Sequence, residues 1–404
     1  MKDANCDYPK PAMLPSSPHF SSGPCKKHPG WSLDQMSIDL PGRSHRGRKC
    51  KRRLAEAIER SHRLLGLPDD WVVGIVPGSG TGAIEFALLN LLGPKDVDVI
   101  VSDGFSAYWA NDICQIMGQS TFVHKVPFDL SKIHPNRDTV LVYNGTGNGF
   151  CFNNLDWVSD DREGLVIADA ASAAFAMPMD FEKLDVVTWS WQKGLGSEAG
   201  HGMVAFSPRA LARAVATRPV TLRPKVMDLR KTDGTVLMNL FAGHTISTPS
   251  ILALEDLHSA LDWAEGIGGR TALWRRVRSN QAVFDTWVAQ TSWIDWLAPK
   301  DVRSPVSICL RLVLPHAWVD PEKVKSSMIS LLEEEEAAFD IFTMHDAPAG
   351  FRIWAGPTVE AADLRCLTEW LEWAFDVAMH QLELERWVAI HAADRPVERA
   401  KIPT

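Results

Sequence analysis

One lysine and one aspartate stand at the ends of two apolar runs that are typical of buried strands. Lys193 closes the segment Ser190-Trp191-Gln192-Lys193, and Asp169 ends the run 165–169, 24 positions earlier in the chain. A lysine amine can form an imine with an aldehyde, and a carboxylate can hold a protonated pyridine nitrogen. This pair is the minimum protein equipment for chemistry on pyridoxal 5′-phosphate, so the sequence predicts that cofactor.

A glycine-rich segment, 78–82, follows the predicted strand 71–76 and precedes a predicted helix. Glycines let backbone N–H groups approach an anion at a helix N-terminus, so the segment predicts a phosphate site. With Asp103 about 20 residues further on, it also resembles a dinucleotide-binding fingerprint. The competing interpretation is therefore an NAD-dependent dehydrogenase, although that interpretation leaves Lys193 and Asp169 without a role.

The composition is that of a folded protein large enough for two domains. The chain has 404 residues, of which 46% are hydrophobic and 23% charged, and its net charge of −8 argues against binding to nucleic acid. It has neither an apolar signal segment nor a run of about 18 apolar residues, so we expect no membrane association. Seven scattered cysteines favour reduced thiols in a cytoplasmic protein and no metal site. We expect the sixteen tryptophans, many of them after residue 260, to fill cores or interfaces.

Short apolar runs alternate with helical patterns over the first 210 residues, which predicts an α/β fold with a mostly parallel sheet covered on both faces. The predicted strands are 71–76, 97–101, 139–143, 165–169, 186–190 and 202–206, and the helices between or before them are 47–65, 83–92 and 106–117. Beyond residue 249 the pattern predicts helices at 249–265, 271–290, 321–334 and from 360, with strands at 305–314, 339–344 and 351–355. This second pattern indicates a smaller α+β domain.

Seven groups of residues, in chain order, resemble the phosphoserine aminotransferase family of class V, fold type I pyridoxal-phosphate enzymes. They are 20–25 with 29–31, Gly42-Arg43-Ser44-His45-Arg46, Asn144-Gly145-Thr146, Asp169-Ala170-Ala171-Ser172, Ser190–Lys193 with His201-Gly202, Ser247-Thr248-Pro249-Ser250, and 346–352. The resemblance covers nearly the whole chain. It implies an N-terminal arm at 1–18, a large domain with a mostly parallel seven-stranded sheet at 19–262, and a small α+β domain at 263–404.

The resemblance also implies roles for single residues. Lys193 would hold the cofactor as an imine and move protons, and Asp169 would pair with the ring N–H. Trp109 would stack on the cofactor ring, and Thr146 would hydrogen-bond near its phenolic oxygen. Backbone N–H groups around Gly80 and Thr81, with the Gln192 side chain, would hold the cofactor phosphate. Ser247 and Thr248 from the second subunit of a homodimer with shared active sites would also reach this phosphate, and Ser172 would be a further cofactor-binding residue.

The substrate-binding residues implied by the resemblance are His45, Arg46, His345 and Arg352. Arg352 would clamp the substrate α-carboxylate. Met344-His345 stands where the family usually has an arginine for the substrate phosphate. The implied activity is transfer of the amino group of L-glutamate to 3-phosphohydroxypyruvate, which gives O-phospho-L-serine and 2-oxoglutarate. The alternatives are a transaminase for another acidic or polar amino acid, a pyridoxal-phosphate lyase, and a binding protein that has lost catalysis.

Overall fold

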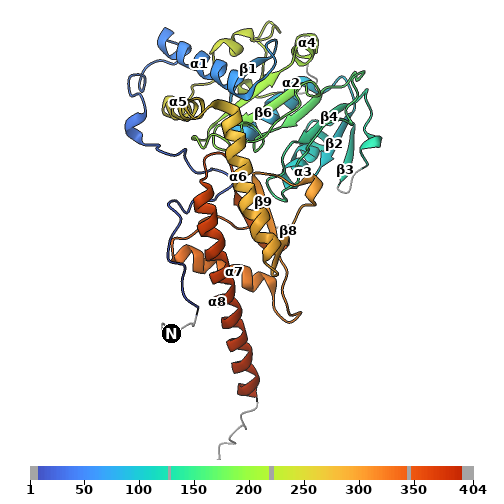
Figure 1. Ribbon diagram of the computed structural model, residues 1–404. Helices are drawn as coiled ribbons and strands as arrows, with labels where there is room; N and C mark the ends of the chain where they lie inside the picture. Colours follow the sequence, from blue (N-terminus) through green and yellow to red (C-terminus); the bar gives the residue numbers. More distant parts are fainter. Residues whose placement is uncertain (1–7, 126–128, 218–222, 344–346, 394–404) are drawn as a thin grey trace, which may run out of the picture.

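The computed structural model describes residues 8–125, 129–217, 223–343 and 347–393 (Figure 1). Within these ranges the larger sheet has seven strands in the order β1 (Val72–Pro77), β7 (His201–Phe206), β6 (Val186–Ser190), β5 (Val166–Asp169), β4 (Asp138–Val142), β2 (Val97–Val101) and β3 (Thr121–Lys125). Strand β7 is antiparallel to both of its neighbours, and the remaining strand pairs are parallel. The predicted α/β class with a mostly parallel seven-stranded sheet is confirmed. No helix in the described ranges is both long and apolar enough to cross a membrane.

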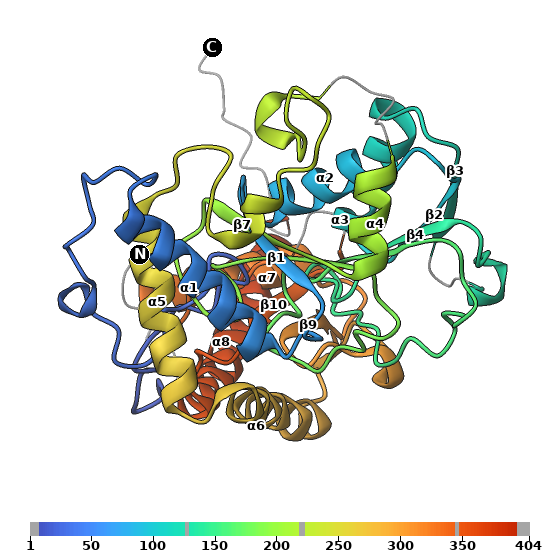
Figure 2. The same cartoon turned by 90° about the horizontal axis from the view of Figure 1, so that it is seen from above.

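Consecutive residues of the central strands enter two different cores, so both faces of the sheet are covered there. Val186 faces one core and Val187 the other, and Val204 and Ala205 alternate in the same way. Helices α2 (Ser79–Leu91) and α4 (Pro208–Ala216) cover one face, with α3 (Gly104–Asn111) near β2. Helices α1 (Arg48–Leu65) and α5 (Ile251–Gly266) lie side by side on the other face (Figure 2). The strands therefore read as continuous apolar runs, as the sequence predicted.

A second, antiparallel sheet contains β8 (Ile294–Trp296), β9 (Ser307–Leu312) and β10 (Gly350–Trp354). It shares a core with α7 (Pro321–Glu334) and with α8 (Ala361–Ala393), which runs away from the larger sheet (Figure 1). Helix α6 (Gly269–Gln290) joins the two units, since Leu273 lies in the first core and Phe284 in the second. The domain limits at 18/19 and 262/263 remain a proposal. Phe20, in the range assigned to the large domain, packs in the second core.

Several element boundaries differ from the prediction for local physical reasons. The segment 78–82 is not a separate turn, because α2 already begins at Ser79, and a Cβ on Gly82 would lie only 2.1 Å from the Pro77 carbonyl oxygen. Helix α3 starts at Gly104, where Asp103 and Ser106 form a capping box, and one π-helical turn, η2 (Asp112–Ile116), follows it. The remaining short turns are η1 (Leu33–Gln35), η3 (Leu130–Lys132), η4 (Lys225–Met227), η5 (Met238–Ala242) and η6 (Lys300–Val302).

Some predicted strands are absent and some observed ones were missed. The strand predicted at 339–344 is wrong over its described part, where Phe339 and Phe342 form isolated bridges; the Phe339 N–H donates to the Pro18 carbonyl in the arm, at 2.9 Å. The sequence missed β3, whose side chains are largely exposed at the sheet edge, and β8, which has three residues. Helix α4 was also missed. Exposed or very short elements carry little hydrophobic pattern by which to predict them.

Most of the late tryptophans fill the second core, as predicted from the sequence. Two of them share one partner. The indole N–H groups of Trp287 and Trp293 donate to the Glu372 carboxylate at 2.7 and 3.0 Å, and the Thr291 hydroxyl donates to it at 2.9 Å. The single side chain of Glu372, on α8, therefore accepts hydrogen bonds from both α6 and the loop before β8.

We predict that Glu372→Ala lowers the free energy of unfolding by roughly 2–4 kcal/mol, because it leaves two largely buried indole donors without an acceptor. Glu369→Ala, at an exposed position on the same helix, should change it by less than about 0.5 kcal/mol. Urea unfolding followed by tryptophan fluorescence measures both values. Equal effects of the two substitutions would contradict a structural role for the Glu372 contacts.

Candidate active site

The predicted site residues follow the carboxyl ends of neighbouring parallel strands of the larger sheet. Trp109 comes after β2, Thr146 after β4, Asp169 at the end of β5, and Lys193 after β6. Parallel strands bring such ends to one edge, which is the usual place for a ligand in an open α/β sheet. Here the edge encloses a cavity of ≈ 170 Å³.

This cavity brings together eight of the predicted site residues: Gly80, Thr81, Trp109, Thr146, Asp169, Ser172, Gln192 and Lys193. Its other lining residues were not predicted as site residues: Gly23, Ser79, Phe105, Val142, Ala171 and Ser190. Four of these, Gly23, Ser79, Ala171 and Ser190, stand inside motifs that the sequence analysis had singled out. The sequence therefore contained a signal for these four residues, but only the fold shows that they face the cavity.

Close packing fixes Lys193. It follows the fully buried Trp191 by two positions in the chain. The next residue, Gly194, is also closely packed, since a Cβ there would lie 2.4 Å from the Ala174 carbonyl oxygen. Its Nζ donates to the Ser22 carbonyl, and a Cβ on Gly23 would come within 2.8 Å of Nζ. Burial lowers the pKa of Lys193, which favours the neutral amine that imine formation requires.

The buried carboxylate of Asp256, on α5, accepts hydrogen bonds from two segments near Lys193: the N-terminal loop that contacts the lysine and the segment that follows it in the chain. From the N-terminal loop, Lys27 Nζ and Trp31 Nε1 donate to it at 2.8 and 2.6 Å. From the segment after the lysine, the Ser197 hydroxyl donates at 2.7 Å and the Glu198 N–H at 2.6 Å. Asp256 thus fixes the loop that touches Lys193 against the chain that carries it.

Asp169 lies deep in the cavity and accepts two hydrogen bonds. Trp109 Nε1 donates to Oδ2 at 3.1 Å, and the Ala171 N–H donates to Oδ1 at 3.0 Å. Burial nevertheless raises the pKa of Asp169 to about 6. A positively charged pyridinium N–H would stabilise the ionised carboxylate, so this position fits the ring nitrogen of pyridoxal phosphate.

The start of α2 provides a site for the phosphate. Its N-cap residue, Gly78, provides no side-chain hydrogen bond, which leaves the first backbone N–H groups of the helix without a side-chain cap. The buried Ser190 hydroxyl has no hydrogen-bond partner among the described residues, and a Cβ on Gly80 would lie 3.3 Å from it. An anion at this helix end would accept from both groups, so the residues present fit the phosphate of the cofactor.

Thr146 lies in a short chain of hydrogen bonds. Its hydroxyl lies 2.9 Å from that of Ser172, and the Ser172 hydroxyl donates to the Asn144 carbonyl at 2.8 Å. The arrangement orders the loop after β4 next to the cavity, where a hydroxyl could contact the ring oxygen of the cofactor.

The remaining predicted residues that the structure describes do not line the cavity. His45 and Arg46 lie in the loop before α1, half-buried and exposed, and Ser247 and Thr248 lie in the loop before α5. Arg352, on β10, is close enough for its charge to lower the pKa of Lys193, and its buried Nε has no partner within the described ranges. His345 lies outside the described residues.

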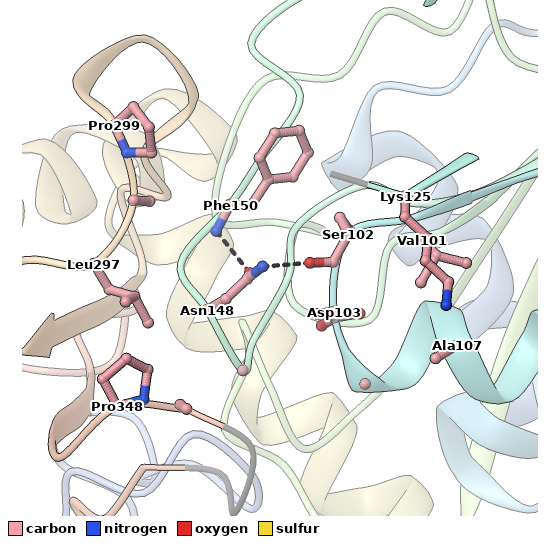
Figure 3. Close-up of a pocket in the computed structure, with 14 residues that line it drawn as sticks. Val101, Ser102, Asp103, Ala107, Lys125, Asn148, Phe150, Leu297, Pro299 and Pro348 are labelled. Carbon is pink, nitrogen blue, oxygen red and sulfur yellow. Dashed lines mark hydrogen bonds between the residues drawn. The ribbon is translucent and has the colours of Figure 1, made fainter. Parts of the chain in front are cut away.

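A larger cavity, ≈ 560 Å³, lies beside this site (Figure 3). Asp103 and Ala107 line it, whereas Phe105 and Trp109 of the same helical turns line the smaller cavity. Asn148 holds the loop between the two cavities, since its amide donates to the Ser102 carbonyl and accepts from the Phe150 N–H at 3.0 Å. No predicted site residue lines the larger cavity among the residues described, so the chemical groups, and not the volume, identify the candidate cofactor site.

We predict that Asp169→Asn stabilises the cofactor-free protein at about pH 8. The native pKa of about 6 lies above the ordinary value of 3.8, so the native state binds the extra proton more tightly, and ionisation costs stability as the pH rises through this window. The gain should be about 1–3 kcal/mol, reduced by the lost Trp109 bond, and should vanish near pH 4.

Urea unfolding of the cofactor-free proteins at several pH values measures this effect. Asp233→Asn removes an exposed carboxylate whose pKa is lowered by Thr235 and should show no such gain. An Asp169→Asn protein less stable than the parent at about pH 8 would contradict the proposed burial of an uncompensated charge.

Comparison with known proteins identifies the family. No family model matches the chain. Curated relatives named phosphoserine aminotransferase are 47% identical in Methanosarcina mazei and 46% identical in Methanosarcina barkeri, each over 91% of this chain and 99% of the relative. Among solved structures, a phosphoserine aminotransferase from Cytophaga hutchinsonii is similar in fold, with TM-score 0.74 and 18% identity over 87% of this chain and 97% of that one. An alanine–glyoxylate aminotransferase from Nostoc has TM-score 0.75 and 18% identity over 91% and 97%. The chain therefore belongs to the phosphoserine aminotransferase family.

Proposed function

We propose that this protein is a pyridoxal-phosphate-dependent aminotransferase that moves the amino group of L-glutamate to 3-phosphohydroxypyruvate. The products are O-phospho-L-serine and 2-oxoglutarate. One observation carries the proposal: Lys193, Asp169 and the start of α2 line the same cavity. An amine, a carboxylate for a ring nitrogen and an anion site are the three groups that this cofactor needs.

The same observation disfavours a dehydrogenase. The glycine-rich segment that suggested a dinucleotide site opens onto the cavity that holds Lys193, so one phosphate-bearing ligand accounts for both features. The 47% identity to a protein named phosphoserine aminotransferase supports the choice of substrate.

The residues act on the substrate as follows. When bound, the cofactor supplies an aldehyde for amine exchange and an electron sink. Lys193 Nζ, with its lowered pKa, is suited to accept the proton from the substrate Cα and to donate one in return. Asp169 would pair with the ring nitrogen and keep it protonated. Trp109 donates a hydrogen bond to the Asp169 carboxylate and would cover the ring.

Arg352 is suited to bind the substrate α-carboxylate. Burial lowers the pKa of this arginine, and its Nε has no partner among the described residues, so an anionic ligand would compensate a poorly solvated cation. A planar guanidinium can grip a carboxylate with two parallel hydrogen bonds.

We further propose that a second copy of the chain completes each site. His45, Arg46, Ser247 and Thr248 do not line the cavity of their own chain, and Arg46 and Thr248 are exposed. In a homodimer these residues would reach the partner's cavity, where His45 and Arg46 would bind the acidic side group of the substrate.

A related transaminase for another acidic or polar amino acid is the second candidate. It is favoured by Met344-His345, because neutral histidine binds a phosphate dianion less well than arginine does.

Steady-state kinetics with 2-oxoglutarate and O-phospho-L-serine tests the proposal. We expect Lys193→Ala to abolish turnover, and Arg352→Lys to lower kcat/KM at least about tenfold, because lysine cannot form the bidentate pair. Arg311→Lys is the matched control, since Arg311 lies on the adjacent strand β9 and pairs with Asp295 at the surface. Full activity of the Lys193 variant would refute the mechanism, and a preference for L-aspartate over O-phospho-L-serine would favour the second candidate.

A further inference from the structure

His201, the first residue of β7, touches three separate segments of the chain. Its backbone pairs with Pro77 at the end of β1. Its ring stacks on Trp191, with a centroid distance of 4.7 Å and an interplanar angle of 20°. Its Nε2 accepts a hydrogen bond from the Ser250 N–H at 3.2 Å. The ring therefore connects the segment after β6 with the loop before α5, and the backbone of the same residue connects both with the end of β1.

Each of these segments leads directly to a residue proposed to hold the cofactor phosphate. Pro77 precedes the start of α2, which carries Gly80 and Thr81, and Trp191 precedes Gln192. Ser250 follows Ser247 and Thr248, the pair proposed to reach the phosphate of the second subunit. The backbone next to His201 also contacts the start of α2, since the Gly78 N–H donates to the Gly200 carbonyl at 3.1 Å.

The hydrogen bond from Ser250 defines the charge state of the ring. Because Nε2 accepts, the ring is neutral and carries its proton on Nδ1. That Nδ1 is buried without a partner among the described residues. The small space beside the ring is lined by residues that do not titrate: Ile75, Val76, Pro77, Thr245, Ile246, Ser247 and Pro249. Burial alone lowers the pKa of His201, and no neighbouring charge opposes it.

We propose that His201 is a positioning residue for the cofactor phosphate: its neutral ring ties the segment after β6 to the loop before α5, its backbone ties both to the end of β1, and protonation of the ring weakens phosphate binding. This inference rests on the proposed function. In the proposed homodimer, one ring would join the phosphate site of its own subunit to the loop that serves the partner's site.

The direction of the pH effect follows from the hydrogen bond. At neutral pH the ring is unprotonated and accepts from Ser250. As the pH falls from 6.5 through the lowered pKa, Nε2 gains a proton and can no longer accept the hydrogen bond from Ser250. Two N–H donors, that of Nε2 and that of Ser250, then face each other. The folding stability from this group is therefore present above about pH 6.5 and is lost as the pH falls below it. The phosphate affinity from this group is lost as the pH falls through the lowered pKa of the folded protein.

Two substitutions separate the hydrogen bond from the stacking. His201→Phe keeps a flat ring against Trp191 but has no acceptor for Ser250. His201→Gln keeps an acceptor oxygen and cannot be protonated. The probes are pyridoxal 5′-phosphate and pyridoxal, which lacks the phosphate, and their dissociation constants are measured on the cofactor-free proteins by tryptophan fluorescence.

We expect His201→Phe to bind pyridoxal 5′-phosphate about tenfold more weakly than the parent at about pH 7.5, the ratio for one lost hydrogen bond of about 1.4 kcal/mol. Its affinity for pyridoxal should be unchanged. His201→Gln should match the parent at about pH 7.5 and lose less affinity than the parent as the pH falls from 6.5 through the lowered pKa of His201. Comparing His201→Gln with the parent at each pH cancels the effect of the titration of the phosphate itself, because this effect is the same for both proteins.

His258→Gln is the control, because His258 is also buried with a lowered pKa but bonds to the Arg53 carbonyl, outside the cofactor cavity. Unchanged affinity of His201→Phe, or an equal loss for pyridoxal, would overturn the inference while leaving the proposed function intact. If the parent protein bound neither probe, the proposed function would fail, and this inference with it.

Discussion

The structure depends on the burial of two ionisable groups, Lys193 and Asp169, at the ends of adjacent strands. Burial destabilises the charged form of each, so the pKa of the lysine is lowered and that of the aspartate is raised to about 6. Such shifts cost folding free energy and cluster at functional sites. A cofactor with an aldehyde and a protonated ring nitrogen would use both shifted groups, which gives a physical reason to keep them.

Rigid surroundings make this burial possible. β5 and β6 are central strands whose residues are covered on both faces, so their ends move little. The loop that contacts Lys193 lies outside this sheet, and Asp256 helps to hold it through hydrogen bonds to the loop and to the segment after the lysine. We propose the corresponding task for His201 at the start of α2, since its ring contacts two segments and its backbone pairs with a third.

The central part of the fold was predictable from the sequence, because buried parallel strands appear as short apolar runs. The same runs located Lys193 and Asp169, and the resemblance supplied six further residues of the cavity, but another six lining residues were not predicted. The edge strand β3 escaped prediction because its exposed side chains carry no such pattern. Asp256 escaped prediction, and so did the contacts of His201, although His201 stands in one of the family-like motifs; each acts through partners that only the folded chain brings together. Asp256, for example, lies 229 positions from Lys27. The role proposed for Ser247 and Thr248 came from the resemblance alone, because it involves a second copy of the chain.

The most direct test is the absorbance spectrum of the purified protein during separate additions of L-glutamate and O-phospho-L-serine. Each amino acid should remove the band of the lysine-bound cofactor, because each can donate its amino group. Loss of the band with glutamate alone would contradict phosphoserine as the substrate. If no such band formed even after pyridoxal 5′-phosphate was added, Lys193 would not carry the cofactor, and the central claim would be wrong.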